Sequence, residues 1–170
     1  MRLSDWQSRA PHPDAMTPRV QGPTIEALAL LGAGRDPECW VVWGDDPAAR
    51  YTILALSMAG LVVINCRVNV PGEGPRAGGK IVRWSRLQVG ELSVEVQGGH
   101  RVITFQIEQQ LLHGVDTDAE EIARFVDTVF AAMDGRWTAV SGAIGPPSPV
   151  AGGTPSSSIE PPSELKATDF

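Results

Sequence analysis

The sequence predicts an α+β domain that is mostly β: a bent antiparallel sheet, a sandwich or a partly open barrel of about six to seven strands, with a C-terminal amphipathic helix. Three observations lead to this fold class. Short apolar runs rich in β-branched and aromatic residues alternate with turn sequences over residues 39–108. A Gly-Gly pair separates two of these runs, which is typical of a tight hairpin. Residues 117–133 repeat apolar side chains with a helical period.

The apolar runs predict the positions of the strands. Residues 51–56 and 61–68 are almost continuously apolar, which indicates burial on both faces or a central place in the sheet. Residues 71–79 hold four glycines and two prolines, so we expect a loop there. The predicted strands cover residues 39–43, 51–56, 61–68, 80–87, 91–97 and 100–108.

The Gly98-Gly99 turn fixes the register of the last predicted hairpin, because a two-residue loop pairs the residues on its two sides in order. Leu92 then lies opposite Phe105 and Val94 opposite Ile103, all on one apolar face. The other face is mostly polar, with the pairs Glu91–Gln106, Ser93–Thr104 and Glu95–Val102. This alternation is typical of a sheet with one buried face.

The C-terminal helix has a start signal and one continuous apolar face. Thr117 and Glu120 have the spacing of a capping box, which predicts that Thr117 caps the helix. The apolar stripe suits a helix that closes the core, which leaves sheet edges, basic segments and chain ends as places for function. The stripe consists of Ile122, Phe125, Val126, Val129, Phe130 and Met133.

Both ends of the chain differ in composition from its centre. Residues 1–22 are polar and broken by prolines, which predicts a flexible leader. Thr24 is positioned to cap a short helix over residues 25–31, although a strand is an alternative for so short a piece. Residues 138–170 contain six Pro, six Ser and four Gly, which predicts a disordered tail. The folded domain is therefore expected over residues 23–137.

The order of elements between Trp40 and Met133 resembles a bacterial pleckstrin-homology-like (PH-like) domain. The resemblance rests on the runs at 51–56, 60–64, 80–84 and 100–107 and on the helix at 119–133. It implies that the helix plugs one open end of a bent sandwich and that the chain is a binding module. PH-like folds serve many functions, so the resemblance does not fix one.

Composition restricts the classes of partner. The net charge of -6 argues against a binder of duplex nucleic acid, and contact with a membrane surface is left open but not favoured. The longest apolar run, residues 53–64, is shorter than the roughly 20 residues of a transmembrane helix. We expect no transmembrane segment and a cytoplasmic location. Cys39 and Cys66 lie in apolar runs as small buried residues, with a bridge between them left open.

No motif in the sequence specifies a reaction. Neither a nucleophile-elbow pattern nor a Walker-type loop occurs, and no two of the three histidines have metal-ligand spacing. We therefore expect no catalytic residues, no metal site, no cofactor and no enzymatic activity.

One local charge asymmetry marks a candidate ligand site. Residues 67–86 carry five basic side chains and a single acidic one, Glu73, in an otherwise acidic chain. The candidate ligand-binding residues are Arg76, Lys80, Arg83 and Arg86. Our leading interpretation is a non-catalytic binding or scaffolding module that acts through a protein partner. The alternative is a binder of an anionic ligand or lipid headgroup through this basic segment.

Overall fold

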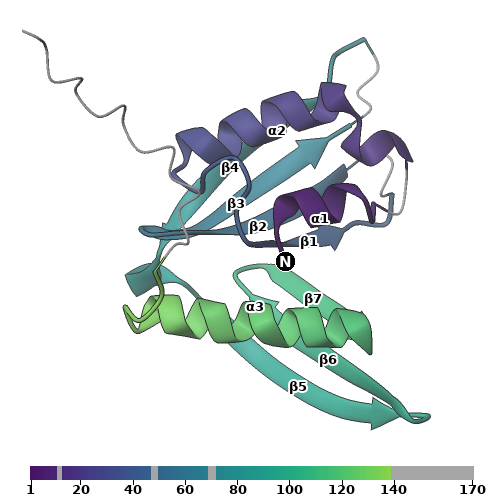
Figure 1. The fold of residues 1–170 in the computed structure, drawn as a ribbon, viewed down its shortest axis with the longest axis vertical. Helices are drawn as coiled ribbons and strands as arrows, with labels where there is room; N and C mark the ends of the chain where they lie inside the picture. The colour runs from purple at the N-terminus through teal and green to yellow at the C-terminus, as the bar shows by residue number, and fades with distance from the viewer. Residues whose placement is uncertain (11–12, 47–49, 69–71, 139–170) are drawn as a thin grey trace, which may run out of the picture. The chain divides into compact units, whose positions relative to one another are not determined.

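The computed structural model describes residues 1–10, 13–46, 50–68 and 72–138. Seven strands in the described residues form two antiparallel sheets, with the orders β1–β2–β3–β4 and β5–β6–β7 (Figure 1). They do not close into a barrel, so the predicted mostly β, α+β fold is confirmed in its two-sheet form. The strands are β1 Cys39–Trp43, β2 Arg50–Ser57, β3 Gly60–Arg67, β4 Arg76–Arg83, β5 Val89–Gln97, β6 His100–Ile107 and β7 Gln110–Val115.

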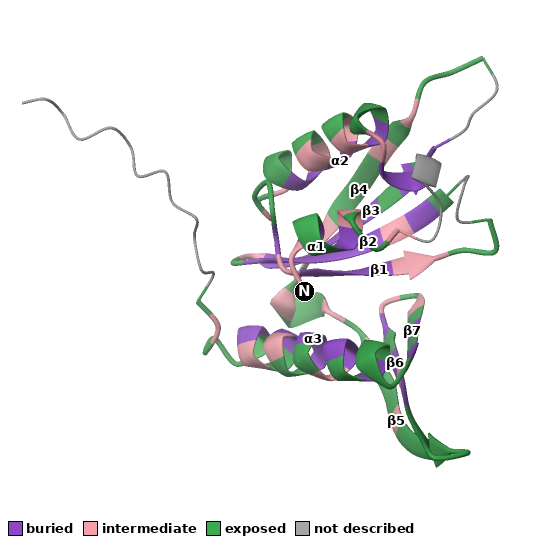
Figure 2. Cartoon of the chain, turned by 45° about the vertical axis from the view of Figure 1, so that its right-hand side comes forward, coloured by how far each residue is buried: buried purple, intermediate pink, exposed green. Residues whose placement is uncertain are grey.

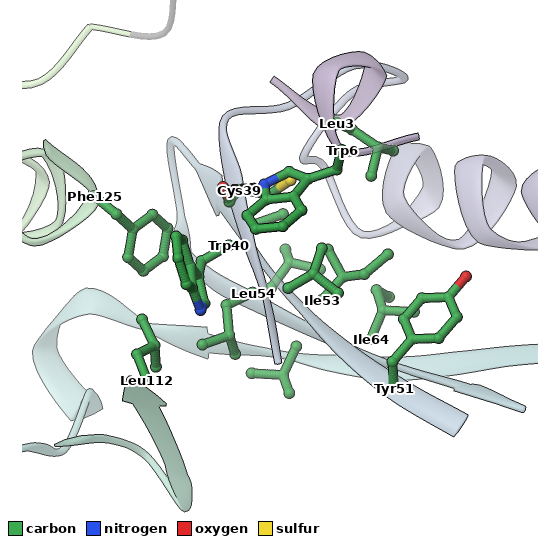
Figure 3. Close-up of a cluster of buried hydrophobic side chains, with 14 of the residues drawn as sticks. Leu3, Trp6, Cys39, Trp40, Tyr51, Ile53, Leu54, Ile64, Leu112 and Phe125 are labelled. Carbon is green, nitrogen blue, oxygen red and sulfur yellow. Dashed lines mark hydrogen bonds between the residues drawn. The ribbon is translucent and has the colours of Figure 1, made fainter. Parts of the chain in front are cut away.

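The first sheet is covered on both faces along its central strands. Neighbouring side chains of β2 point to opposite faces, so Tyr51 and Leu54 lie on different sides. The Tyr51 hydroxyl donates a hydrogen bond to the Ala15 carbonyl oxygen at 2.8 Å, which places its face against the N-terminal helices. Trp40 pairs with Leu54 on the other face and lies beside Phe125 of the C-terminal helix (Figure 3). Burial on both faces confirms the interpretation of the continuous apolar runs.

The flexible leader predicted over residues 1–22 is instead part of the fold. This segment forms α1 (Leu3–Gln7), η1 (Pro13–Met16) and the first part of α2 (Pro18–Leu30), and α2 packs on β3 and β4. Several of its apolar side chains join the core, because they cover a sheet face that would otherwise be exposed to water. These side chains are Leu3, Trp6, Ala15, Met16 and Val20.

The helix expected at residues 25–31 is the second half of a longer one. α2 begins at Pro18, where a missing N–H is tolerated because first-turn amides lack intrahelical partners. Thr24 therefore does not cap the helix, and its hydroxyl donates to the Val20 carbonyl oxygen at 2.9 Å. Pro23 lies within the helix and removes one of its hydrogen bonds.

The glycine-rich segment over residues 71–79, predicted as a loop, contains the start of β4. A Cβ on Gly79 would overlap the Val63 carbonyl oxygen of β3, so glycine allows the close approach of these two strands. The predicted strand over residues 80–87 also ends early, because η2 (Trp84–Arg86) follows β4.

The predicted hairpin register is confirmed for four pairs: Leu92–Phe105, Ser93–Thr104, Val94–Ile103 and Glu95–Val102. The pair expected at Glu91 is not formed, since an irregularity between Val89 and Leu92 shifts the register there. A seventh strand, β7, follows the last strand expected from the sequence and pairs with β6.

The C-terminal helix α3 spans Thr117–Met133 and packs on β6 and β7. Its cap differs from the predicted one. Asp116 occupies the cap position with φ of 49°, and no side-chain capping bond is formed. The Asp116 carboxylate instead accepts hydrogen bonds from His100 Nδ1 at 2.7 Å and from the Arg101 backbone N–H at 3.1 Å. The Asp116 carboxylate therefore binds the start of β6 and not the backbone amides of the helix.

Candidate protein-binding surface

The four predicted ligand-binding residues are spread along one edge of the first sheet. Arg76, Lys80 and Arg83 lie on β4, and Arg86 lies on η2. At about 3.3 Å per residue, Arg76 and Arg83 are roughly 23 Å apart along the strand. Arg83 also points to the opposite face from Lys80, because their positions differ by an odd number.

Two of these basic side chains already face carboxylates. Arg76 forms an ion pair with Glu73 at 2.9 Å, and Lys80 Nζ lies 4.0 Å from a Glu108 oxygen. Both basic side chains are well exposed, so these pairs contribute little to stability. The geometry thus places acids beside two of the four basic residues and does not gather the four around one point.

Both histidines in the described residues have side-chain partners. His113 Nδ1 lies 3.2 Å from the Thr104 hydroxyl, and His100 pairs with Asp116. The hydrogen bond from His100 is the main cause that lowers the pKa of the Asp116 carboxyl. Within the described residues, no group of three His, Cys, Asp or Glu side chains could hold a metal ion. None of the helices described is long and apolar enough to cross a membrane.

Cys39 and Cys66 are both free and buried. Cys39 lies opposite Ala55 and Cys66 opposite Tyr51, so the two thiols are four positions apart along β2 and do not pair. Burial raises the pKa of both thiols, which keeps them protonated and unreactive.

A cavity of about 360 Å³ lies beside β1 and β7. Trp6, Trp40 and Trp43 contribute aromatic walls, and the rings of Trp6 and Trp40 meet edge to face at 5.0 Å. Arg9 and Asp118, which also line the cavity, form an ion pair at 3.0 Å. Arg9 and Asp118 therefore pair with each other, while His113 also lines the cavity and has its Nδ1 beside the Thr104 hydroxyl.

The second sheet leaves several large apolar side chains uncovered. α3 packs on β6 and β7, whereas β5 is exposed along most of its length (Figure 2). The Phe130 ring lies 6.3 Å from the ring of Phe105, the residue paired with Leu92, so the helix end and β5 border each other. We call this surface the β5–α3 strip, formed by Leu92, Val94, Val96, Phe130 and Met133, which are 45%, 58%, 76%, 39% and 37% exposed.

This strip corrects two expectations from the sequence. The apolar face of the hairpin was predicted to be buried, but only the β6 side is, with Ile103 and Phe105 in the core. The helix stripe was predicted to close the core along its whole length, but Phe130 and Met133 at its end are partly exposed. The apolar face of the sheet is therefore wider than the helix that covers it.

The opposite face of β5 is polar and internally hydrogen bonded. The Ser93 hydroxyl and the Gln97 amide donate to the Glu95 carboxylate at 2.9 and 2.8 Å. These bonds, the one from Gln97 first, lower the pKa of Glu95. β5 is thus an amphipathic strand whose polar residues face water and whose apolar residues form the strip.

β5 is also an edge strand, since β6 is its only neighbour among the strands that the structure describes. An edge strand has backbone N–H and C=O groups without partners in its own sheet and can pair with another strand. Sequence reasoning missed the strip because alternation shows which residues share a face and not how much of that face a helix covers.

Comparison of the chain with protein-family models, curated proteins and solved structures gives no match.

Proposed function

We propose that this chain is a non-catalytic protein-binding module that takes its partner on the β5–α3 strip. The observation that carries the proposal is the co-location of five exposed large apolar side chains with a free strand edge. A contiguous apolar patch on a folded domain is typical of a protein contact. An extended partner segment on a sheet edge gains main-chain hydrogen bonds as well as apolar contacts.

The magnitudes favour a partner that engages both features. Burying a whole apolar side chain of this size contributes about 1.5–3 kcal/mol, so the exposed half of five side chains contributes about 5 kcal/mol. Association costs on the order of 4–15 kcal/mol in lost translational and rotational freedom and ordering. The strip alone does not exceed that cost. Strand pairing, with roughly 0.5–1.5 kcal/mol per hydrogen bond, supplies the difference.

The proposal also includes two expectations from the sequence, a PH-like fold and a cytoplasmic location. A PH-like fold is supported by the order of four strands, three strands and a closing helix. A cytoplasmic location also stays a prediction from the sequence.

Site-specific photo-crosslinking tests the proposed function. A photoreactive phenylalanine analogue replaces Val94 in the full chain, and the matched control carries it at Met58, which is 63% exposed on the β2–β3 turn. We expect a protein adduct of defined mass from position 94 and none from position 58 in cells that make the chain. Equal adducts from both positions, or none from position 94, would contradict the proposal.

A further inference from the structure

We propose that the partner of the β5–α3 strip is a second copy of this chain, joined through antiparallel pairing of β5 with β5 across a two-fold axis at Val94. This inference rests on the proposed function, because it takes the strip to be a protein contact. The resulting sheet has six strands, three from each copy, since β5 is the edge of a three-stranded sheet.

The hairpin determines which backbone groups of β5 point outward. Gln97 and His100 flank the two-residue turn and pair with each other. In a tight two-residue hairpin, the flanking pair exchanges both hydrogen bonds, and hydrogen-bonded and non-hydrogen-bonded pairs then alternate along the ladder. Leu92, Val94 and Val96 therefore belong to the non-hydrogen-bonded set, and their N–H and C=O groups point away from β6. The residues that form the apolar face also supply the free edge.

A two-fold axis at Leu92 would bring the register irregularity between Val89 and Leu92 into the new ladder, and an axis at Val96 would pair only a few residues next to the turn. Among the three central registers, charge makes the choice. With the two-fold axis at Ser93, Glu91 would face Glu95 of the second copy, and with the axis at Glu95 that carboxylate would face its own equivalent. Directly opposed like charges destabilise a strand pair. With the axis at Val94, Glu91 faces Gln97 and Glu95 faces Ser93, so no carboxylate meets another.

The same register makes the apolar face continuous across the axis. Leu92 lies opposite Val96 of the second copy, and Val94 lies opposite Val94. Because all three side chains share the α3 side of the sheet, the strips of the two copies merge, with Phe130 and Met133 of each copy at the borders. A two-fold interface requires a surface that is complementary to its own copy, and this register makes the strip complementary to itself.

The experiment measures the mass of the full chain by light scattering and sedimentation equilibrium from micromolar to millimolar concentration. We expect a reversible dimer of 2 × 18.1 kDa. Val94→Arg places two cations at the axis and should raise the dissociation constant roughly 100-fold. The matched control Met58→Arg adds the same charge on another exposed site and should leave it unchanged.

A pair of variants at one position tests the register. Ser93→Glu places a carboxylate opposite Glu95 of the second copy and should weaken the dimer about threefold to tenfold, whereas Ser93→Arg should strengthen it by a similar factor. Ser93 lies at a strand edge, and unchanged circular dichroism and melting temperature show that each variant remains folded.

The outcomes separate the two proposals. A wild-type chain that stays monomeric at millimolar concentration overturns the second copy as partner, while adducts from position 94 to another protein would leave the proposed function standing. If the chain dimerises but Val94→Arg leaves the dissociation constant unchanged, β5 is not the interface. Equal effects of Ser93→Glu and Ser93→Arg overturn the register.

Discussion

Gly79 of β4 is a position where a single methyl group should be costly to the first sheet. A Cβ there would overlap the Val63 carbonyl oxygen and lie 2.7 Å from Ile64 Cδ1. Its neighbour Gly78 is also exposed, and neither glycine has a positive φ. A Cβ added to Gly78 meets nothing within 4 Å. Gly79→Ala and Gly78→Ala therefore make the same chemical change in the same strand and differ in the obstacle alone.

The magnitude follows from what has to move. The obstacle is backbone, so Gly79→Ala must separate β3 from β4 and weaken ladder hydrogen bonds. Overpacking costs about 1–3 kcal/mol, and we expect the upper end, near 3 kcal/mol, because the nearest obstacle is a backbone oxygen that cannot rotate away. Gly78→Ala should instead stabilise the chain by about 0.5 kcal/mol, since alanine has less backbone freedom to lose on folding.

Urea denaturation followed by circular dichroism measures both variants against the wild type. A loss near 3 kcal/mol corresponds to a melting temperature lower by about 10 °C in a chain of this size. If the two variants lie within 0.5 kcal/mol of each other, the close pairing of β3 and β4 at Gly79 is refuted.

Two further predictions test the ends of the domain. Trp6→Ala should cost about 3–5 kcal/mol of unfolding free energy, measured in urea, because the buried indole packs on the sheet and its Nε1 donates to the Cys39 carbonyl oxygen; a loss below 1 kcal/mol would restore the flexible leader. The pKa of Asp116 is lowered in the folded state, so its stabilising contribution is present above the unfolded pKa and lost as the pH falls through the folded one. An NMR titration of that carboxyl should show its pKa rise in His100→Ala, and an unchanged value would show that His100 is not the cause.

Local patterns with a fixed geometric meaning were predictable from the sequence. The Gly-Gly turn determined four cross-strand pairs, because a two-residue loop leaves the register no freedom. The 3.6-residue period located α3, because nothing but a helix aligns those positions on one face. The continuous apolar runs of β2 and β3 indicated two-sided burial before either cover was known.

Features that depend on distant contacts were not predictable in the same way. Pro18 and Pro23 suggested an irregular chain. α2 nevertheless forms, because the packing of its buried side on the sheet contributes more than the hydrogen bond lost at Pro23 costs. Gly78 and Gly79 suggested a loop. In the structure they lie in a strand, and the missing side chain of Gly79 allows β3 to approach closely. The β5–α3 strip depends on the width of the sheet relative to one helix, a quantity that no single segment of sequence contains.

The two covers of the first sheet have a consequence for synthesis of the chain on the ribosome. The N-terminal helices precede β2 and β3 and are available when those strands emerge, whereas α3 follows them by about 50 residues. At 5–20 residues per second, translation leaves the face that carries Trp40 and Leu54 exposed for roughly 3–10 seconds. During that interval the nascent chain presents a half-covered apolar sheet, so chaperone dependence should be concentrated before residue 133 is made.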